Sequence, residues 1–327
     1  MGGFWAVAGL CVFFVFLYLF GMFLKKNKKA AAAILVLFIV FFVLVLLLPP
    51  SGGKSPGPGA SGDSVVDEAP LGQLVVHFID VGQGDAILVR SPEQDILIDG
   101  GPRSAGGFVA SYLQSLGVEE LDLVVGTHPH EDHIGGLIAV LETFPVGEVL
   151  DPGVAHTTKT FEDYLTVIDR KDIKFTEARA GMIRDLGGGA GLEVLHPGEP
   201  SGGNLNNASV VARLTFGRVS FLFSADAEVE AEQEILGRRL PLSGVILKVG
   251  HHGSRTASSN AYLKAVNPEV AVIMCGSGNE YGHPHRETLV KLAAVGANIY
   301  RTDVHGTIIV VTDGKDYTVK YGRGVEP

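Results

Sequence analysis

Four side chains that can bind a metal ion fall within six residues of this chain. His128 and His130 follow the apolar run Asp122–Gly126, which has the composition of a buried strand, and Asp132 and His133 come directly before a stretch of helical spacing. Two histidines one residue apart can direct both rings to one point, while the next two side chains reach a second point nearby. Imidazole and carboxylate ligands suit Zn²⁺, Mn²⁺ or iron. The segment therefore predicts a metal site at the end of a strand.

Two more carboxylates and a pair of histidines lie where other predicted strands end. Asp99 and Asp226 each close an apolar run, and His251 and His252 follow the predicted strand Gly244–Val249. Strand ends that carry such side chains can meet at one edge of a sheet. We favour His252 as the ligand of the pair, with His251 as the alternative, because the sequence does not separate the two.

Apolar runs punctuated by glycine, proline and polar residues organise the remainder of the chain. Period-two and short continuous apolar runs predict strands at Leu74–Asp80, Ala86–Arg90, Asp95–Asp99, Asp122–Gly126, Glu148–Leu150, Ile173–Glu177, Leu192–Leu195, Ser209–Phe216, Val219–Ser224, Gly244–Val249 and Val270–Cys275, with a closing hairpin of Thr307–Thr312 and Asp316–Tyr321. Helical spacing predicts helices at Phe108–Leu116, Ile134–Phe144, Glu228–Arg238, Ala257–Val266 and His285–Val295. The predicted strands form two consecutive groups in the sequence, and each group is followed by alternating strands and helices. This order favours an α/β fold of two sheets between helices.

The first 48 residues have the pattern of a membrane anchor. Gly2–Leu24 and Ala30–Leu48 contain no charged residue, and each is long enough as a helix to cross a hydrocarbon core of about 30 Å. Four lysines between the two runs favour a cytoplasmic loop. We therefore expect a transmembrane helical hairpin in the cell membrane with the following domain extracytoplasmic. A cleaved signal peptide is the alternative, and it would place the domain on the same side.

The two later regions differ in composition. Residues 49–70 are rich in glycine, serine and proline, which predicts a flexible linker, and residues 71–327 carry the predicted strands and helices. The chain has 36 acidic and 26 basic residues, and five of its lysines precede residue 71. The domain is therefore acidic, which excludes a broad basic footprint for nucleic acid. A polyanion would have to be recognised locally, by a metal or a small patch.

The order of these motifs resembles the metallo-β-lactamase superfamily. Within it, His77–Ala86, His128–Gly136, Leu247–Ser254 and Tyr281–His285 are similar to the metallo-β-lactamase-like domain of ComEC-type DNA-uptake proteins, over residues 73–322. A weaker similarity is to phosphorylcholine esterases. The resemblance implies an αββα sandwich that binds Zn²⁺, with two ions expected and Mn²⁺ as the alternative metal.

The resemblance also assigns roles to particular residues. The metal ligands that it implies are His128, His130, Asp132, His133, Asp226 and His252. Asp226 would bridge two ions, Asp132 would orient the attacking water, and Asp99 and Asn207 would support the ligands without touching the metal. Apart from the resemblance, we expect His283 to reach the reacting groups, with an ordinary polar loop before a helix as the alternative, and we expect Gln83, Asp85 and Ser254 to contact substrate. Gln83 and Asp85 fit ordinary turn chemistry equally well.

One position departs from the pattern of many superfamily members, which have another metal-binding histidine between His133 and Asp226. Only His156 and His196 are available there, and neither lies in a recognisable motif. A turn that contains Asn204, Asn206 and Asn207 occupies the region instead, as in the ComEC-type branch. A centre with only one ion is therefore the alternative to the dinuclear one.

Together these features predict a membrane-anchored, extracytoplasmic metallo-hydrolase. By resemblance the substrate is a phosphodiester, with DNA as one candidate, and the reaction is attack by a water whose pKa the metal ions lower. A hydrolase of a small ester, of the phosphocholine, lactone or acyl type, is the second hypothesis. A non-catalytic, metal-containing binding domain is the third. Nothing in the sequence indicates a protein partner.

Overall fold

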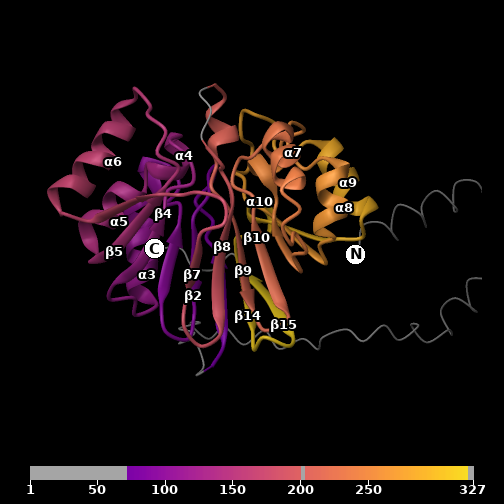
Figure 1. Cartoon of the computed structure of the whole chain (residues 1–327), viewed down its shortest axis with the longest axis horizontal. Helices are drawn as coiled ribbons and strands as arrows, with labels where there is room; N and C mark the ends of the chain where they lie inside the picture. The colour runs from indigo at the N-terminus through magenta and orange to yellow at the C-terminus, as the bar shows by residue number, and fades with distance from the viewer. Residues whose placement is uncertain (1–71, 200–202, 323–327) are drawn as a thin grey trace, which may run out of the picture. The chain divides into compact units, whose positions relative to one another are not determined.

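The computed structural model describes residues 72–199 and 203–322 (Figure 1). These residues belong to one of the two units into which the chain divides, Val65–Pro327. The predicted transmembrane helices and the linker lie in residues 1–70, outside the described residues. Within the described ranges, no helix combines the length and the apolar character that crossing a bilayer requires.

Fifteen strands of the described residues form two mixed sheets. The first sheet has the order β15-β14-β1-β2-β3-β4-β5-β6, and its strands are β1 (Leu74–Phe78), β2 (Ile87–Arg90), β3 (Asp95–Ile98), β4 (Leu121–Val125), β5 (Val146–Asp151), β6 (Lys174–Glu177), β14 (Thr307–Thr312) and β15 (Tyr317–Gly322). The second sheet has the order β13-β12-β11-β10-β9-β8-β7, and its strands are β7 (Ile183–Asp185), β8 (Ala190–His196), β9 (Val211–Phe216), β10 (Val219–Phe223), β11 (Ile246–Lys248), β12 (Val270–Ile273) and β13 (Asn298–Arg301). From β3 to β6, and from β10 to β13, neighbouring strands are parallel.

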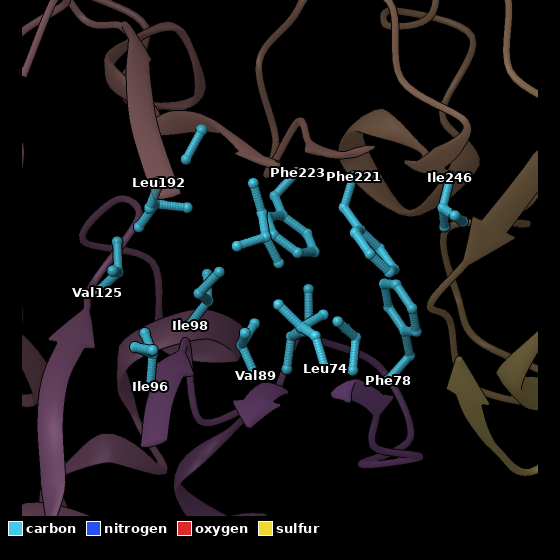
Figure 2. Close-up of a cluster of buried hydrophobic side chains, with 14 of the residues drawn as sticks. Leu74, Phe78, Val89, Ile96, Ile98, Val125, Leu192, Phe221, Phe223 and Ile246 are labelled. Atoms are coloured by element: carbon cyan, nitrogen blue, oxygen red, sulfur yellow. The ribbon is translucent and has the colours of Figure 1, made fainter. Parts of the chain in front are cut away.

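The inner faces of the two sheets pack against each other to form the central core. Figure 2 shows Leu74, Val89 and Ile98 of the first sheet opposite Phe221 and Phe223 of the second. The period-two alternation of a strand explains this arrangement, because every second side chain of β1 enters the core. The intervening His77 faces the other way, and its Nδ1 lies 2.9 Å from the hydroxyl of Tyr112 on a covering helix.

Helices cover the outer face of each sheet, so the layers are helix, sheet, sheet and helix (Figure 1). The first sheet is covered by α3 (Gly106–Ser115), α4 (Glu131–Ile134), α5 (Leu137–Thr143) and α6 (Lys159–Arg170). The second is covered by α7 (Val229–Gly237), α8 (Asn260–Val266) and α9 (Arg286–Ala294). The shorter helices are η1 (Arg103–Ala105), η2 (Leu205–Ala208), η3 (Gly250–Gly253) and α10 (Thr302–His305). The predicted sandwich of two sheets between helices is confirmed.

Some elements differ from the sequence-based prediction. Helix α6 was not predicted, although Phe161, Tyr164 and Ile168 are buried at helical spacing against the first sheet. Strands β7 and β13 and helix α10 were also missed; all are short. The helix predicted over 134–144 is confirmed over Leu137–Thr143, but its predicted start is wrong, because Ile134 belongs to the separate turn α4. The two helices are separated at Gly135 and Gly136, where the Gly136 amide donates to the carbonyl of Gly101 at 2.8 Å instead of to a carbonyl of the helix.

A buried carboxyl at the end of β5 makes stability depend on pH. Asp151 is 2% exposed, and burial raises its pKa from 3.8 to about 7. The unfolded chain therefore releases this proton at a lower pH than the folded chain does. Between these two pKa values the unfolded state binds fewer protons, so this group lowers the free energy of unfolding as pH rises.

Asp151→Asn should remove that dependence, because the amide stays neutral while its oxygen can still accept the hydrogen bond from the Gly153 amide. Relative to the unmodified chain, the free energy of unfolding of Asp151→Asn should increase by a few kcal/mol, on the order of 1.4 kcal/mol per unit of pKa shift, between about pH 4 and 8. Denaturant titrations at several pH values measure the difference. A difference that does not change with pH would contradict the prediction.

Candidate metal centre

Loops from both sheets bring the predicted ligands to one end of the sandwich. In the first sheet β4 leads into His128–His133, and in the second sheet β10 and β11 lead into Asp226 and the pair His251–His252. β10 and β11 are parallel neighbours, so their carboxyl ends lie side by side. The two sheets meet at this point, where the Nε2 atoms of His133 and His252 are 3.3 Å apart.

Glycine allows the loops to approach this closely. Gly84, in the loop between β1 and β2, has a positive φ of 137°, and a Cβ at this position would collide with the carbonyl of Asp132. The next residue, Asp85, donates its amide to that same carbonyl at 3.2 Å. The β1–β2 loop is thereby attached to the loop that carries the histidines.

The carboxylate of Asp226 lies at the middle of the cluster. Its Oδ1 is 3.4 Å from His133 Nε2, and its Oδ2 is 3.4 Å from His252 Nε2 and 3.9 Å from His128 Nε2. The side chain is only 3% exposed. Asp226 thus lies between the imidazoles of both sheets, which is the position that a bridging carboxylate needs.

Two contacts orient His133 and His252. His133 Nδ1 is 2.7 Å from Asp99 Oδ2, and His252 Nδ1 is 2.9 Å from the carbonyl of Met274. In each ring this leaves Nε2 directed to the centre. Such outer hydrogen bonds fix the ring orientation of metal-binding histidines. Asp99 also accepts hydrogen bonds from the amide and the hydroxyl of Thr127, so it holds the loop that carries the histidines.

The protonation of the histidines differs across the site. Burial lowers the pKa of His128 well below its ordinary value, so this ring is neutral and offers a lone pair. Burial alone would also lower the pKa of His133 and of His252, but nearby carboxylates, Asp226 first, raise both well above the ordinary value. Without a metal, His133 and His252 are therefore protonated, and the extra proton on each ring occupies the position that a metal cation would take. Metal binding is therefore coupled to proton release and strengthens as pH rises.

The arrangement fits a metal. Asp85, His133, Asp226 and His252 each offer one donor atom, and these four atoms lie within 4.8 Å of one another. Asp226 Oδ1 is buried and makes no hydrogen bond to the described residues. A buried carboxylate oxygen without a hydrogen bond is costly unless a cation occupies the space beside it. The nitrogen and oxygen donor set suits Zn²⁺ or Mn²⁺.

Asp85 has a different position from the one expected of a substrate contact. It is 1% exposed and lies behind the histidine rings, with its Oδ1 3.4 Å from His252 Nδ1. Its other oxygen pairs with the ammonium of Lys248, which also donates to the carbonyl of Ala225 at 3.0 Å and lies 3.9 Å from Asp226 Oδ1. Lys248 is itself 1% exposed, so this ion pair is fully buried beneath the cluster.

A cavity of about 860 Å³ opens above the cluster. Among the expected site residues, those that line it are Gln83, His130, Asp132, Asp226, His251, His252 and His283. The ring of His283 lies 6.2 Å from that of His252 between centroids, and burial, followed by the neighbouring histidines, lowers its pKa to about 4. At neutral pH His283 is therefore uncharged, and it can donate or accept one hydrogen bond at the wall of the cavity.

Ser254 and Asn207 do not line this cavity. Ser254 is 4% exposed, and its hydroxyl lies 3.0 Å from that of Thr256. Asn207 accepts a bond from the backbone amide of Glu228 through its side-chain oxygen. Asn207 therefore acts on a residue that contacts His251, since Glu228 Oε1 lies 3.1 Å from His251 Nδ1.

The two histidines between His133 and Asp226 also have defined positions. His196 is buried, with Nδ1 2.9 Å from the carbonyl of Ser209 and Nε2 3.5 Å from Glu234, away from the cluster. His156 lines the cavity, with its ring centroid 6.1 Å from that of His130 and its Nδ1 3.1 Å from the Thr158 hydroxyl.

Three residues of the site were not predicted from the sequence. Lys248 interrupts an otherwise apolar strand, and that charge within Ile246–Lys248 was the available signal. Tyr281 opens the segment Tyr281–His285 that carries the family resemblance, but no role was assigned to it, and Glu228 left no signal. In the structure Glu228 contacts His251, and Tyr281 stacks on His283 at 5.6 Å.

Comparison with known proteins agrees with this geometry. Residues 79–277 match the metallo-beta-lactamase superfamily, so the chain belongs to that superfamily. It is 31% identical over 254 residues to ComE operon protein 3 of Bacillus subtilis, covering 71% of this chain and 32% of that protein. It is 32% identical over 246 residues to competence protein ComA of Neisseria gonorrhoeae, covering 74% and 33%. The chain spans about a third of the length of these relatives.

Among solved structures, the chain is similar to the metallo-beta-lactamase fold protein YhfI of Bacillus subtilis. The identity is 14%, the coverage is 73% of this chain and 100% of that chain, and the TM-score is 0.46. The match to the family and the two competence-protein relatives confirm the predicted superfamily and the distant homology to competence proteins.

Lys248→Met should destabilise the domain, because it leaves Asp85 as a buried carboxylate without its cation. Breaking such a pair from one side costs about 3–5 kcal/mol. The double variant with Asp85→Asn should recover a large part of that loss, since it removes the uncompensated charge. Denaturant unfolding of both single variants and of the double variant gives the coupling energy. Additive losses would show that the pair does not interact.

Proposed function

We propose that this chain is a metal-dependent hydrolase that cleaves phosphodiesters, with DNA as one candidate substrate. The observation that carries the proposal is the position of the buried histidine–aspartate cluster, which lines the 860 Å³ cavity through Asp226 and His252, next to the partly exposed Asp132. A substrate in that cavity would present its reacting group directly to the metal-binding side chains.

The charge of the cavity narrows the class of substrate. No lysine or arginine is among its lining residues in the described part of the chain, whereas Glu131, Asp132, Asp226 and Glu280 line it. A long nucleic-acid backbone would need basic side chains to replace its counterions. The cavity therefore favours a substrate that engages one or two phosphates, whose charge the bound metal would neutralise.

An exposed aromatic side chain supports a nucleotide in this position. Tyr281 is 58% exposed, lines the cavity and stacks on His283 with an angle of 23° between the rings. Stacking of a base on an aromatic ring stabilises single-stranded nucleic acid by about 1–3 kcal/mol per base and tolerates any sequence. The similarity to a protein named as a competence protein is in line with DNA.

Different groups at the site would supply different parts of the hydrolysis. Bound metal ions supply Lewis-acid stabilisation and lower the pKa of water. Burial would raise the pKa of Asp132, but His133 and His252 hold it below its ordinary value, so this carboxylate is ionised and can accept a hydrogen bond from the attacking water. The neutral ring of His283 can donate a hydrogen bond to a substrate oxygen, and Asp226 keeps the imidazoles of the two sheets together.

His130→Ala tests the proposal. The purified chain, supplied with Zn²⁺ or Mn²⁺, should hydrolyse bis-p-nitrophenyl phosphate and cleave single-stranded DNA, and the variant should lose more than about 100-fold in rate. The expectation follows because loss of even an outer partner of a metal ligand costs about 10–100-fold. His305→Ala, a half-buried histidine on α10 outside the cavity, is the matched control and should keep the activity.

The outcomes separate the hypotheses. Metal binding without cleavage of either substrate would contradict the phosphodiesterase and direct the search to small esters, such as phosphocholine or acyl esters. If the chain binds metal, keeps its fold and hydrolyses none of these esters, the non-catalytic, metal-containing binding domain is the better description. A folded chain that binds no metal would contradict the metal-dependent hydrolase.

We propose in addition that residues 1–48 anchor the domain in the cell membrane with the domain outside the cytoplasm. Two uncharged runs separated by four lysines support this topology. Protease added to intact cells should then degrade the domain, while the lysine-containing loop stays protected. Protection of the domain until the cells are lysed would overturn the proposal.

A further inference from the structure

Both histidines of the pair after β11 are directed to the same carboxylate oxygen. Asp226 Oδ2 lies 3.4 Å from His252 Nε2 and 3.7 Å from His251 Nε2. The sequence treats these residues as alternatives, because neighbouring side chains ordinarily diverge. In the structure they converge, since both have left-handed backbone conformations, with φ of 47° and 52°. This conformation is unfavourable for residues with a Cβ, and two in succession are rarer still.

The other side of the His251 ring is held by a carboxylate. His251 Nδ1 lies 3.1 Å from Glu228 Oε1 and 3.2 Å from the hydroxyl of Thr256, and that hydroxyl donates to the same Glu228 oxygen at 2.8 Å. A carboxylate that accepts from one ring nitrogen leaves the lone pair of the other nitrogen for a metal. His251 is oriented in this way, with Nε2 directed to Asp226.

The asparagine-rich turn explains why Glu228 is so firmly held. The side-chain amides of Asn204 and Asn206 donate to its two carboxylate oxygens, at 2.6 and 3.4 Å, and Asn207 accepts from its backbone amide at 3.0 Å. All three asparagines therefore hold one residue, Glu228: Asn204 and Asn206 through its carboxylate and Asn207 through its backbone amide. Because Glu228 is held in this way, its carboxylate fixes the orientation of the His251 ring.

His128 Nε2 and His251 Nε2 both face Oδ2 of Asp226, and His130 lies beside His128. His128 Nε2 lies 3.0 Å from His130 Nδ1 and 3.9 Å from Asp226 Oδ2, so these three side chains could share one ion. His252 is oriented to the neighbouring group instead, with Nε2 3.2 Å from Asp132 Oδ2 and 3.3 Å from His133 Nε2. Zinc takes four ligands, and a catalytic site commonly takes three of them from the protein. With His251, which faces the same oxygen of Asp226, the first ion would have three imidazoles beside the shared carboxylate.

We propose that His251 is a ligand of a metal ion held with His128, His130 and Asp226, and that Glu228 and the asparagine turn position it. His252 then belongs to a second ion with Asp132, His133 and the same Asp226. The inference rests on the metal centre of the proposed function and completes it as a dinuclear site. Glu228 is a positioning residue, since it contacts the ligand and not the metal.

Metal binding by the full chain in detergent micelles tests the assignment without any measurement of turnover. After chelator treatment the unmodified chain should bind two Zn²⁺, and His251→Ala should bind one. His251→Asn should do the same, and it keeps the backbone conformation because asparagine tolerates positive φ. The unmodified chain loaded with Co²⁺ should show visible absorption from two bound ions, and His251→Ala loaded with Co²⁺ should show absorption from one. Circular dichroism confirms that each variant is folded.

Glu228 variants test the positioning role. Glu228→Ala should weaken the binding of one of the two ions by about 10–100-fold, whereas Glu228→Gln, which keeps an acceptor oxygen, should recover part of that affinity. His285→Ala is the matched control, because this histidine lies 5.0 Å from His283 between ring centroids but is not among the residues that line the cavity. The control should bind two ions with unchanged affinity.

The result that overturns the inference is a folded His251→Ala or His251→Asn chain that binds two ions with unmodified affinity. An unmodified chain that binds a single ion overturns it as well. Neither result depends on the substrate, so a failure of the phosphodiesterase proposal and a failure of this assignment are distinguishable. If the chain binds two ions and cleaves no phosphodiester, the assignment of His251 as a ligand stands and only the proposed substrate class is rejected.

Discussion

The burial of the Asp226 carboxylate is the interaction on which the site depends. A carboxylate that is 3% exposed is tolerated only if opposite charges and hydrogen-bond donors surround it. Imidazoles of His133, His251 and His252 lie within 3.7 Å of its oxygens, and the ammonium of Lys248 lies 3.9 Å away. These groups come from both sheets, so the same electrostatic requirement holds the two halves of the domain together at this end.

The sandwich makes such a meeting of loops possible. Each sheet contains parallel strands whose carboxyl ends carry ligands, and the apolar inner faces press the two edges against each other. The central core supplies this contact mainly through non-directional burial, to which rings such as Phe78 and Phe223 contribute at 6.4 Å. The directional interactions, which are hydrogen bonds and ion pairs, are concentrated at the metal site. The buried pair of Lys248 and Asp85 lies between these two regions and separates the apolar core from the metal-binding cluster.

Much of the fold and of the site was predictable because the signals are local. Apolar alternation identified most strands, and the segment from His128 to His133 contains its ligands in sequence. Helix α6 was missed although its signal is also local, since Phe161, Tyr164 and Ile168 have helical spacing and the Thr158 side chain caps the first turn. The break between α4 and α5 was missed because it depends on the hydrogen bond from the Gly136 amide to the Gly101 carbonyl, which joins residues far apart in the chain.

The sequence by itself determined the chemistry of the site: histidine and carboxylate donors at the ends of strands, in the order of the metallo-β-lactamase superfamily, on an acidic domain. Only the tertiary structure decided how these donors are shared. It placed Asp85 behind the rings with Lys248 rather than in the cavity, and it turned both His251 and His252 to Asp226. The physical reason is that these contacts join residues on different sheets and loops, and that two successive left-handed residues reverse the usual divergence of neighbouring side chains.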